Sequence, residues 1–278
     1  ILYFRRKTFT MHFSQELADR FMRYVRIDTE ADPNASSFPS SEKQKDLGRL
    51  LTQELIELGA SDVEMDEWGY VFATIPSNSP NQNLPTICFC SHMDTAPDCS
   101  GKDVKPILHR AWNGSPITLP DDTTQVITVE NQPYLSRKIG QDVITASGLT
   151  LLGADDKAGV TIIMELAKHL LTHSEIPHGK IRILFTPDEE VGRGVEHLDM
   201  NKLGADYGYT LDGGPLGEVE DETFSADAMT FTFTGVSAHP GYAKGKMQHA
   251  IKMASAFVAA LPSDRWSPDT TTHRDGFV

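Results

Sequence analysis

Carboxylates and one histidine recur in four short segments of the sequence, and these are side chains that bind metal ions. The segments hold Asp155-Asp156, His92 with Asp94, Glu189-Glu190, and Asp212. Carboxylate oxygen and imidazole nitrogen bind zinc and harder divalent cations. If the fold brings the segments together, they can hold metal ions and activate water for a hydrolytic reaction.

Two segments offer one side chain more than a metal ion needs. Asp94 lies two positions after His92 and can accept the second ring N–H, which fixes the tautomer of the imidazole and raises its basicity. Of Glu189 and Glu190, one can ligate a metal ion while the other acts as general base toward bound water. The glycines after Asp212 leave room for the backbone to approach the site.

Each segment also has an ordinary structural interpretation, which the sequence leaves open. Paired aspartates before a helix are often N-caps. His92 can be a hydrogen-bonded core histidine, and Glu189-Glu190 can be a solvated loop. Asp212-Gly213 is common in turns. The metal-site hypothesis is favoured because all four segments directly follow apolar runs, which one would not expect of scattered surface acids.

Short apolar runs predict the strands that would position these side chains. Residues 86–90, 180–185 and 205–210 are typical of strands buried on both faces. Leu151-Leu152 leads into the paired aspartates, and residues 160–171 follow as a helix, so we expect Asp155 where a strand ends and a helix begins. The alternation predicts an α/β fold with a mostly parallel or mixed sheet, in which ligands bind at the carboxyl ends of strands.

Further elements complete the first domain. Helices are predicted at 14–27 and from Ser41 to Leu58, where Gln44 stands at the capping-box position and Gly59 ends the helix. Strands are predicted at 63–65 and 70–75 around a Trp68-Gly69 turn, and at 126–129 and 143–145.

The pattern changes near residue 217. Residues 229–235 alternate between polar and apolar, as in a sheet with one solvated face, and residues 246–261 have a helical pattern. We therefore predict a metal-binding catalytic domain at 11–216 and the start of a smaller α+β lid domain at 217–278. Residues 1–10 are expected to be a non-native or upstream tail, with Met11 as the natural start.

Composition excludes several classes of protein. The 278 residues carry a net charge of −14, which disfavours nucleic-acid binding, and no apolar run approaches the roughly 20 residues that span a membrane. Three cysteines, Cys88, Cys90 and Cys99, fit a reducing compartment, so we expect a cytoplasmic protein. Cys88 and Cys90 are interpreted as small core residues, with a metal or redox role as the alternative.

Four longer segments resemble the peptidase T family of tripeptide aminopeptidases. They are Ser-His-Met-Asp-Thr-Ala-Pro-Asp-Cys-Ser-Gly, Leu-Leu-Gly-Ala-Asp-Asp-Lys-Ala-Gly, Phe-Thr-Pro-Asp-Glu-Glu-Val-Gly and Thr-Leu-Asp-Gly-Gly-Pro. The family belongs to the co-catalytic zinc enzymes, with the aminoacylases, acetylornithine deacetylase and the glutamate carboxypeptidases. The resemblance runs from about Met11 to the end of the chain. It implies a zinc-binding α/β domain interrupted by a lid or dimerisation domain, through which a homodimer can form.

The resemblance also implies a set of metal ligands. His92 and Asp212 would hold one of two zinc ions, Asp155 would bridge both, and Glu190 would ligate the second. The peptide bond after Asp155 is often cis in such proteins.

The resemblance assigns roles to three further residues. Glu189 would be the general base, and Asp94 would be the partner of the His92 ring. His239, in Gly-Val-Ser-Ala-His-Pro-Gly, is similar to the lid histidine that helps to bind substrate or to stabilise the tetrahedral intermediate.

The implied activity is removal of the N-terminal residue from short peptides, tripeptides in particular, by zinc-activated water. Two alternatives stay open: an aminoacylase or N-deacetylase that uses the same site, and a non-catalytic metal-binding module.

One departure from the family supports the second alternative, the non-catalytic module. The last zinc ligand of the family is a histidine after the lid, and no histidine of this sequence lies in that motif. We therefore expect this chain to be truncated at its C-terminus and to have weak activity or none.

Overall fold

The computed structural model describes residues 12–221, 229–267 and 270. The chain divides into two compact units, Ile1–Val219 and Glu220–Val278, and this division lies close to the boundary predicted after residue 216. The tail predicted at residues 1–10 lies outside the described residues. In the described ranges, no helix is both long enough and apolar enough to cross a membrane.

A five-stranded mixed sheet forms the centre of unit 1, with the strand order β1-β2-β8-β3-β9. The strands are β1 (Ser61–Met65), β2 (Val71–Ile75), β3 (Ile87–His92), β8 (Ile181–Thr186) and β9 (Tyr207–Thr210). Strand β3 runs parallel to β8 and β9, whereas β2 is antiparallel to both β1 and β8. The predicted α/β fold is confirmed. The sheet is mixed because the short turn at Trp68-Gly69 can join only antiparallel strands.

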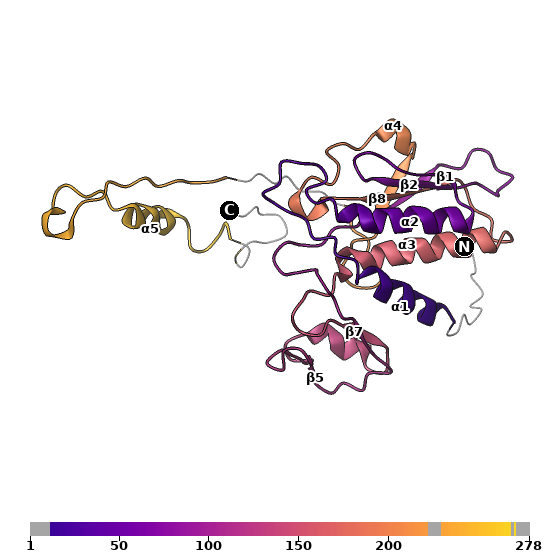
Figure 1. Ribbon diagram of the computed structural model, residues 1–278, viewed down its shortest axis with the longest axis horizontal. Coiled ribbons are helices and arrows are strands. Elements are labelled where there is room, and N and C mark those ends of the chain that lie inside the picture. Colours follow the sequence, from indigo (N-terminus) through magenta and orange to yellow (C-terminus); the bar gives the residue numbers. More distant parts are fainter. Residues whose placement is uncertain (1–11, 222–228, 268–269, 271–278) are drawn as a thin grey trace. The chain divides into compact units, whose positions relative to one another are not determined.

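Three helices lie along one side of this sheet (Figure 1). They are α1 (His12–Tyr24), α2 (Gln44–Leu58) and α3 (Ala154–Thr172), and α3 contacts β3 as well as the other two helices. The short helix α4 (Met200–Leu203) contributes Leu203 to an apolar cluster with residues of β2 and β8.

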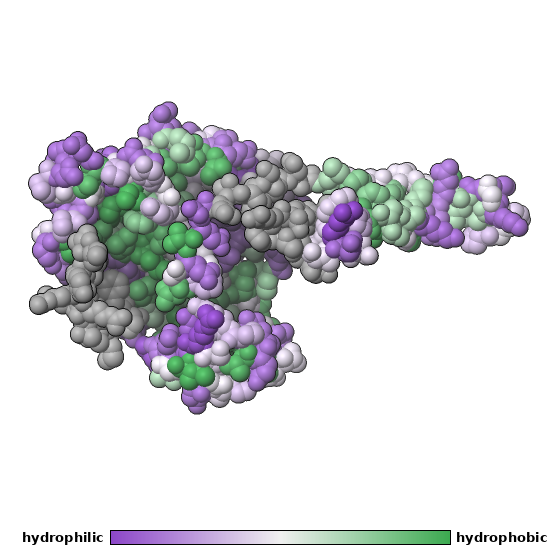
Figure 2. Space-filling model, turned by 180° about the vertical axis from the view of Figure 1, so that it is seen from behind, coloured by the Kyte–Doolittle hydropathy of each residue, from purple (hydrophilic) through white to green (hydrophobic). Residues whose placement is uncertain are grey.

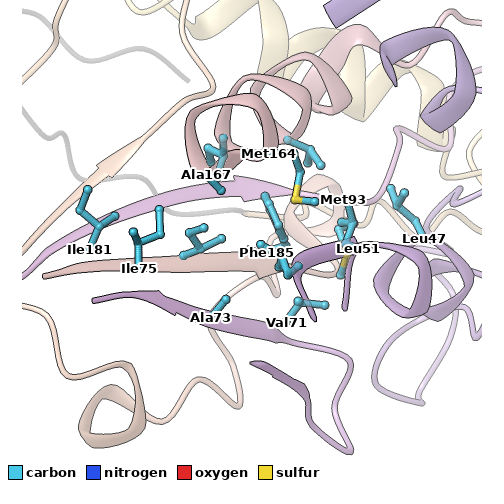
Figure 3. Close-up of a cluster of buried hydrophobic side chains, with 14 of the residues drawn as sticks. Leu47, Leu51, Val71, Ala73, Ile75, Met93, Met164, Ala167, Ile181 and Phe185 are labelled. Atoms are coloured by element: carbon cyan, nitrogen blue, oxygen red, sulfur yellow. The ribbon is translucent and has the colours of Figure 1, made fainter. Parts of the chain in front are cut away.

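Successive residues of β2 and β8 supply two apolar clusters, because neighbouring side chains in a strand point to opposite faces. One cluster packs the strands against α2 and α3 (Figure 3), and its strand residues are Val71, Ala73, Ile75, Ile181, Ile183 and Phe185. The second cluster holds Phe72 and Leu184 together with Leu203. Burial of both faces explains why residues 181–185 are mostly apolar; the exception is Arg182, which is buried and donates hydrogen bonds to the carbonyl oxygen of Leu203 and to Oγ1 of Thr74.

A small lobe interrupts unit 1 between β3 and α3. It contains β4 (Ile107–His109) paired with β7 (Val143–Thr145), β5 (Ile117–Thr118) paired with β6 (Val126–Ile127), and the 3-10 helix η1 (Pro133–Lys138). Trp112, Ile117 and Leu119 form its buried core. Apolar residues also reach the surface of unit 1 (Figure 2).

The segment before the paired aspartates was predicted wrongly. Leu151-Leu152 is not part of a strand, and Asp155 lies in the first turn of α3. Two apolar residues are too few to decide between a strand and a loop. Asp155 therefore approaches the sheet from the end of a helix.

The start of α2 and the burial of β9 were also predicted wrongly. Helix α2 begins at Gln44 and not at Ser41, and Lys43 at its N-cap makes no capping hydrogen bond through its side chain. The four residues of β9, an edge strand of the sheet that the structure describes, are all exposed.

Unit 2 contains the 3-10 helix η3 (Pro240–Tyr242) and the helix α5 (Ala250–Ala260). The strand predicted at 229–235 is wrong, since none of these residues is in a strand. The helix predicted from residue 246 begins four residues later, after His249 at its N-cap. Several apolar side chains of α5 are exposed, among them Ile251 and Val258.

Candidate metal centre

Three adjacent parallel strands bring the predicted site residues to one edge of the sheet. His92 is the last residue of β3, Glu189 follows the end of β8, and Asp212 follows the end of β9. Ligands in open α/β sheets bind at this edge. Asp155 reaches the same place from the N-terminal end of α3.

The imidazole of His92 lies at the centre of these acids. Its Nε2 atom is 2.9 Å from Oδ1 of Asp155, 3.6 Å from Oδ2 of Asp212 and 3.7 Å from Oε2 of Glu189. One ligand atom each from His92, Asp155 and Asp212 lies within 4.8 Å of the other two. Ligands around a tetrahedral zinc ion lie roughly 3.4 Å apart, given metal–ligand distances of about 2.1 Å. The three side chains therefore fit a zinc ion in both type and spacing.

The paired aspartates at the start of α3 have different environments. The peptide bond between Asp155 and Asp156 is cis, as the family resemblance implies. The side chain of Asp155 is 71% exposed, whereas Asp156 is buried. Asp156 accepts hydrogen bonds from the backbone N–H groups of His92, at 3.3 Å, and Gly159, at 3.1 Å. Asp156 thus fixes β3 against α3, a role that the sequence did not distinguish from that of Asp155.

Gly159 allows α3 to approach the site closely. A Cβ atom at this position would lie 2.0 Å from the carbonyl oxygen of Leu211 and 2.4 Å from Oγ of Ser91. Only glycine fits at this distance. The helix can therefore lie against the residue that precedes Asp212.

Asp94 connects the histidine to the loop that carries the glutamates. Its carboxylate is fully buried and lies 3.4 Å from Nδ1 of His92. The same carboxylate accepts the backbone N–H of Glu189 at 3.1 Å and that of Glu190 at 3.0 Å. Nδ1 also lies 3.1 Å from the carbonyl oxygen of Asp94. These contacts leave Nε2 as the ring nitrogen that faces the other acids.

The clustered carboxylates favour positive charge at the site, either a proton on the His92 ring or a metal ion that replaces this proton. Burial alone would lower the pKa of His92, but the hydrogen bond and charge of Asp94, together with the charges of Asp156 and Asp212, raise this pKa to about 10. Burial raises the pKa of Glu189 and of Asp212; His92 opposes the shift, and neighbouring carboxylates add to it. Partly desolvated carboxylates that repel one another are stabilised when a cation binds between them.

The two remaining predicted residues lie outside the three-residue cluster. Glu190 follows Glu189 in the 3-10 helix η2 (Glu189–Val191), and burial together with the charge of Asp155 raises its pKa. His239 is exposed in unit 2, where its Nδ1 accepts the N–H of Gly241 at 3.1 Å. Their roles stay predictions.

The chain is similar to known peptidases in sequence and in structure. A family model described as "Peptidase dimerisation domain" matches residues 222–277. A curated peptidase T from Listeria monocytogenes serotype 4b (strain CLIP80459) is 47% identical over 95% of this chain, which spans 64% of that relative's length. Over nearly all of its length, the chain is similar to peptidase T.

Two solved structures of peptidases are also similar to this chain in fold. The aminopeptidase PepT from Bacillus cereus ATCC 10987 matches with a TM-score of 0.59 at 26% identity, over 91% of this chain and 58% of that one. A tripeptidase from Staphylococcus aureus subsp. aureus Mu50 matches with a TM-score of 0.57 at 25% identity, over 89% of this chain and 56% of that one.

Proposed function

We propose that this chain carries the metal-binding part of an aminopeptidase that removes the N-terminal residue from short peptides, above all tripeptides. The observation that carries the proposal is the convergence of His92, Asp155 and Asp212 within 4.8 Å at one edge of the sheet. The similarity to a curated peptidase T and to a solved tripeptidase supports the class of reaction and substrate.

We assign the metal to zinc, with two ions in the complete site. His92 and Asp212 would hold one ion, Asp155 would bridge the two, and Glu190 would ligate the second. One imidazole and several carboxylates suit zinc, and paired ions require a carboxylate that can reach both. The high exposure of the Asp155 side chain, 71%, leaves its second oxygen accessible to a further ion.

The residues of the chain supply the proton transfers. Bound zinc would lower the pKa of a water molecule toward about 7. Glu189, whose carboxylate lies 3.7 Å from His92 and is 52% exposed, accepts a proton from the attacking water. It then gives the proton to the leaving amine, so that the products are one free amino acid and a shortened peptide. Asp94 holds the His92 ring in place, and His239 helps to bind the substrate.

Location and assembly belong to the same proposal. We place the protein in the cytoplasm, which agrees with the three free thiols of Cys88, Cys90 and Cys99. A homodimer through residues 217–278 is supported by the match of 222–277 to a peptidase dimerisation domain.

Peptide hydrolysis by the zinc-loaded chain tests the function. We expect an unblocked tripeptide to lose its N-terminal residue slowly, as followed by mass spectrometry over a long incubation, and an N-acetylated amino acid to stay intact. Glu189→Gln should retain zinc and lose about 10²- to 10⁴-fold in rate. Cleavage of the acetylated compound instead would favour an N-deacetylase. Zinc binding without hydrolysis of either compound would favour a non-catalytic metal-binding module.

A further inference from the structure

The turn that carries both glutamates is held by buried side chains from distant parts of the chain. Asp188, Glu189 and Glu190 donate three successive backbone N–H groups to such side chains. The N–H of Asp188 goes to Oε1 of Gln44, at 3.1 Å, and the other two go to the carboxylate of Asp94. Gln44, Asp94 and Asp188 are each fully buried.

Gln44 and Asp188 bond each other in both directions. While Oε1 of Gln44 accepts the backbone N–H of Asp188, its Nε2 donates to Oδ1 of Asp188 at 2.6 Å. Ser40 donates to the same carboxylate twice, from its backbone N–H at 2.6 Å and from its hydroxyl at 2.5 Å. The buried carboxylate of Asp188 thus accepts three hydrogen bonds from protein groups in place of water. Satisfied buried networks of this kind hold their members in one geometry.

The backbone of Asp188 has an unusual conformation that the bonds maintain. Its φ is +56°, in the left-handed region that residues other than glycine seldom adopt. The chain therefore turns sharply between the end of β8 and η2. This turn directs Glu189 toward His92, with 3.7 Å between Oε2 and Nε2.

The position of the turn decides where the two glutamates can act. The side chain of Glu189 is 52% exposed, so the groups around it restrain it little. A metal-binding or catalytic group must lie within roughly 0.5 Å of its working position. Because the side chain of Glu189 is little restrained, the backbone of the turn must provide this precision.

We propose that Gln44, acting through Asp188, is a positioning residue that sets Glu189 and Glu190 against the metal site. The inference rests on the proposed function for the roles of the two glutamates. Gln44 itself touches neither the acid cluster nor a substrate. It acts by holding the backbone of the 188–190 turn at one end, while Asp94 holds the other.

The proposal is tested by exchanging the amide group of Gln44 and the carboxylate of Asp188 between the two positions. Gln44→Glu places two carboxylates together, and Asp188→Asn places two amide groups together. The double variant restores one carboxylate and one amide in the opposite order. Gln53→Glu is the matched control, because Gln53 lies exposed on the same helix and bonds Glu57 at 2.8 Å.

Zinc titration by calorimetry is the first measurement, with Glu190→Gln as reference. Glu190→Gln identifies the zinc-binding step that depends on Glu190, because this variant weakens that step. We expect Gln44→Glu to lower the zinc affinity of the same step about 10- to 100-fold. The double variant should recover most of this loss, and Gln53→Glu should bind as the wild type does. A loss in Gln44→Glu no larger than in Gln53→Glu, or a double variant that fails to recover, overturns the proposal.

Amide hydrogen exchange of residues 188–190 in the metal-free chain is the second measurement. Exchange should accelerate in Gln44→Glu and slow again in the double variant; unchanged exchange overturns the proposal. A wild-type chain that binds no zinc would contradict the proposed function, and the exchange rates would still decide whether the pair holds the turn.

Discussion

Oδ1 of Asp94 accepts the backbone N–H of Glu189 at 3.1 Å, although the two residues are 95 positions apart in the chain. Oδ2 of the same carboxylate accepts the N–H of Glu190 at 3.0 Å, and the carboxylate lies 3.4 Å from the His92 ring. One buried group thus positions the histidine and both glutamates.

Asp94→Asn tests this connection. The amide keeps the size of the side chain but removes its charge, and its N–H₂ group faces N–H donors. We expect zinc affinity to fall about 10- to 100-fold, as is typical when a partner of a metal-binding histidine is lost. The exposed Asp98→Asn is the control. If calorimetry gives equal affinities for the two folded variants, Asp94 has no part in metal binding.

Gly159→Ala tests the close approach of α3 to the site. The added Cβ would lie 2.0 Å from the carbonyl oxygen of Leu211 and 2.4 Å from both Oδ1 of Asp156 and Oγ of Ser91. Overpacking of this kind costs about 3 kcal/mol in the free energy of unfolding. Gly208→Ala, where a Cβ meets no atom within 4 Å, should change it by less than about 0.5 kcal/mol. Urea unfolding measures both values, and similar values for the two variants would refute the packing described here.

Thiol labelling tests the burial of β3. Burial raises the pKa of Cys88 to about 11 and that of Cys90 to about 12. At pH 7.5 roughly one in a thousand or fewer of either thiol is the reactive thiolate. In native buffer, an aromatic disulfide reagent should label the exposed Cys99 rapidly and the other two only after unfolding. Rapid labelling of a folded Cys99→Ser chain would show that β3 is accessible.

The sequence predicts best where a local pattern determines the structure. Strands β3 and β8 were predicted correctly because burial on both faces favours mostly apolar segments, and both strands have them despite Arg182 in β8. His92 and Asp212 each follow a parallel strand, so they were expected at the same end of the sheet. The strand order that makes β3 and β9 direct neighbours could not be read from the sequence.

Long-range contacts set the limit of prediction. Gln44 was expected to cap its own helix, but it bonds Asp188, 144 positions away. No local pattern contains that partner. The alternation at 229–235 likewise indicates a strand only if another strand pairs with it, and the described part of unit 2 provides none.

The zinc content of the chain tests the central claim most directly. The chain is loaded with zinc, desalted and measured by elemental analysis beside the double variants His92→Gln/Asp212→Asn and His173→Gln/Asp98→Asn. The second variant is the control, since His173 and Asp98 are exposed and outside the cluster. We predict stoichiometric zinc in the wild type and in the control, and loss of zinc in His92→Gln/Asp212→Asn. Equal zinc in all three chains would contradict the metal site and the hydrolase built on it.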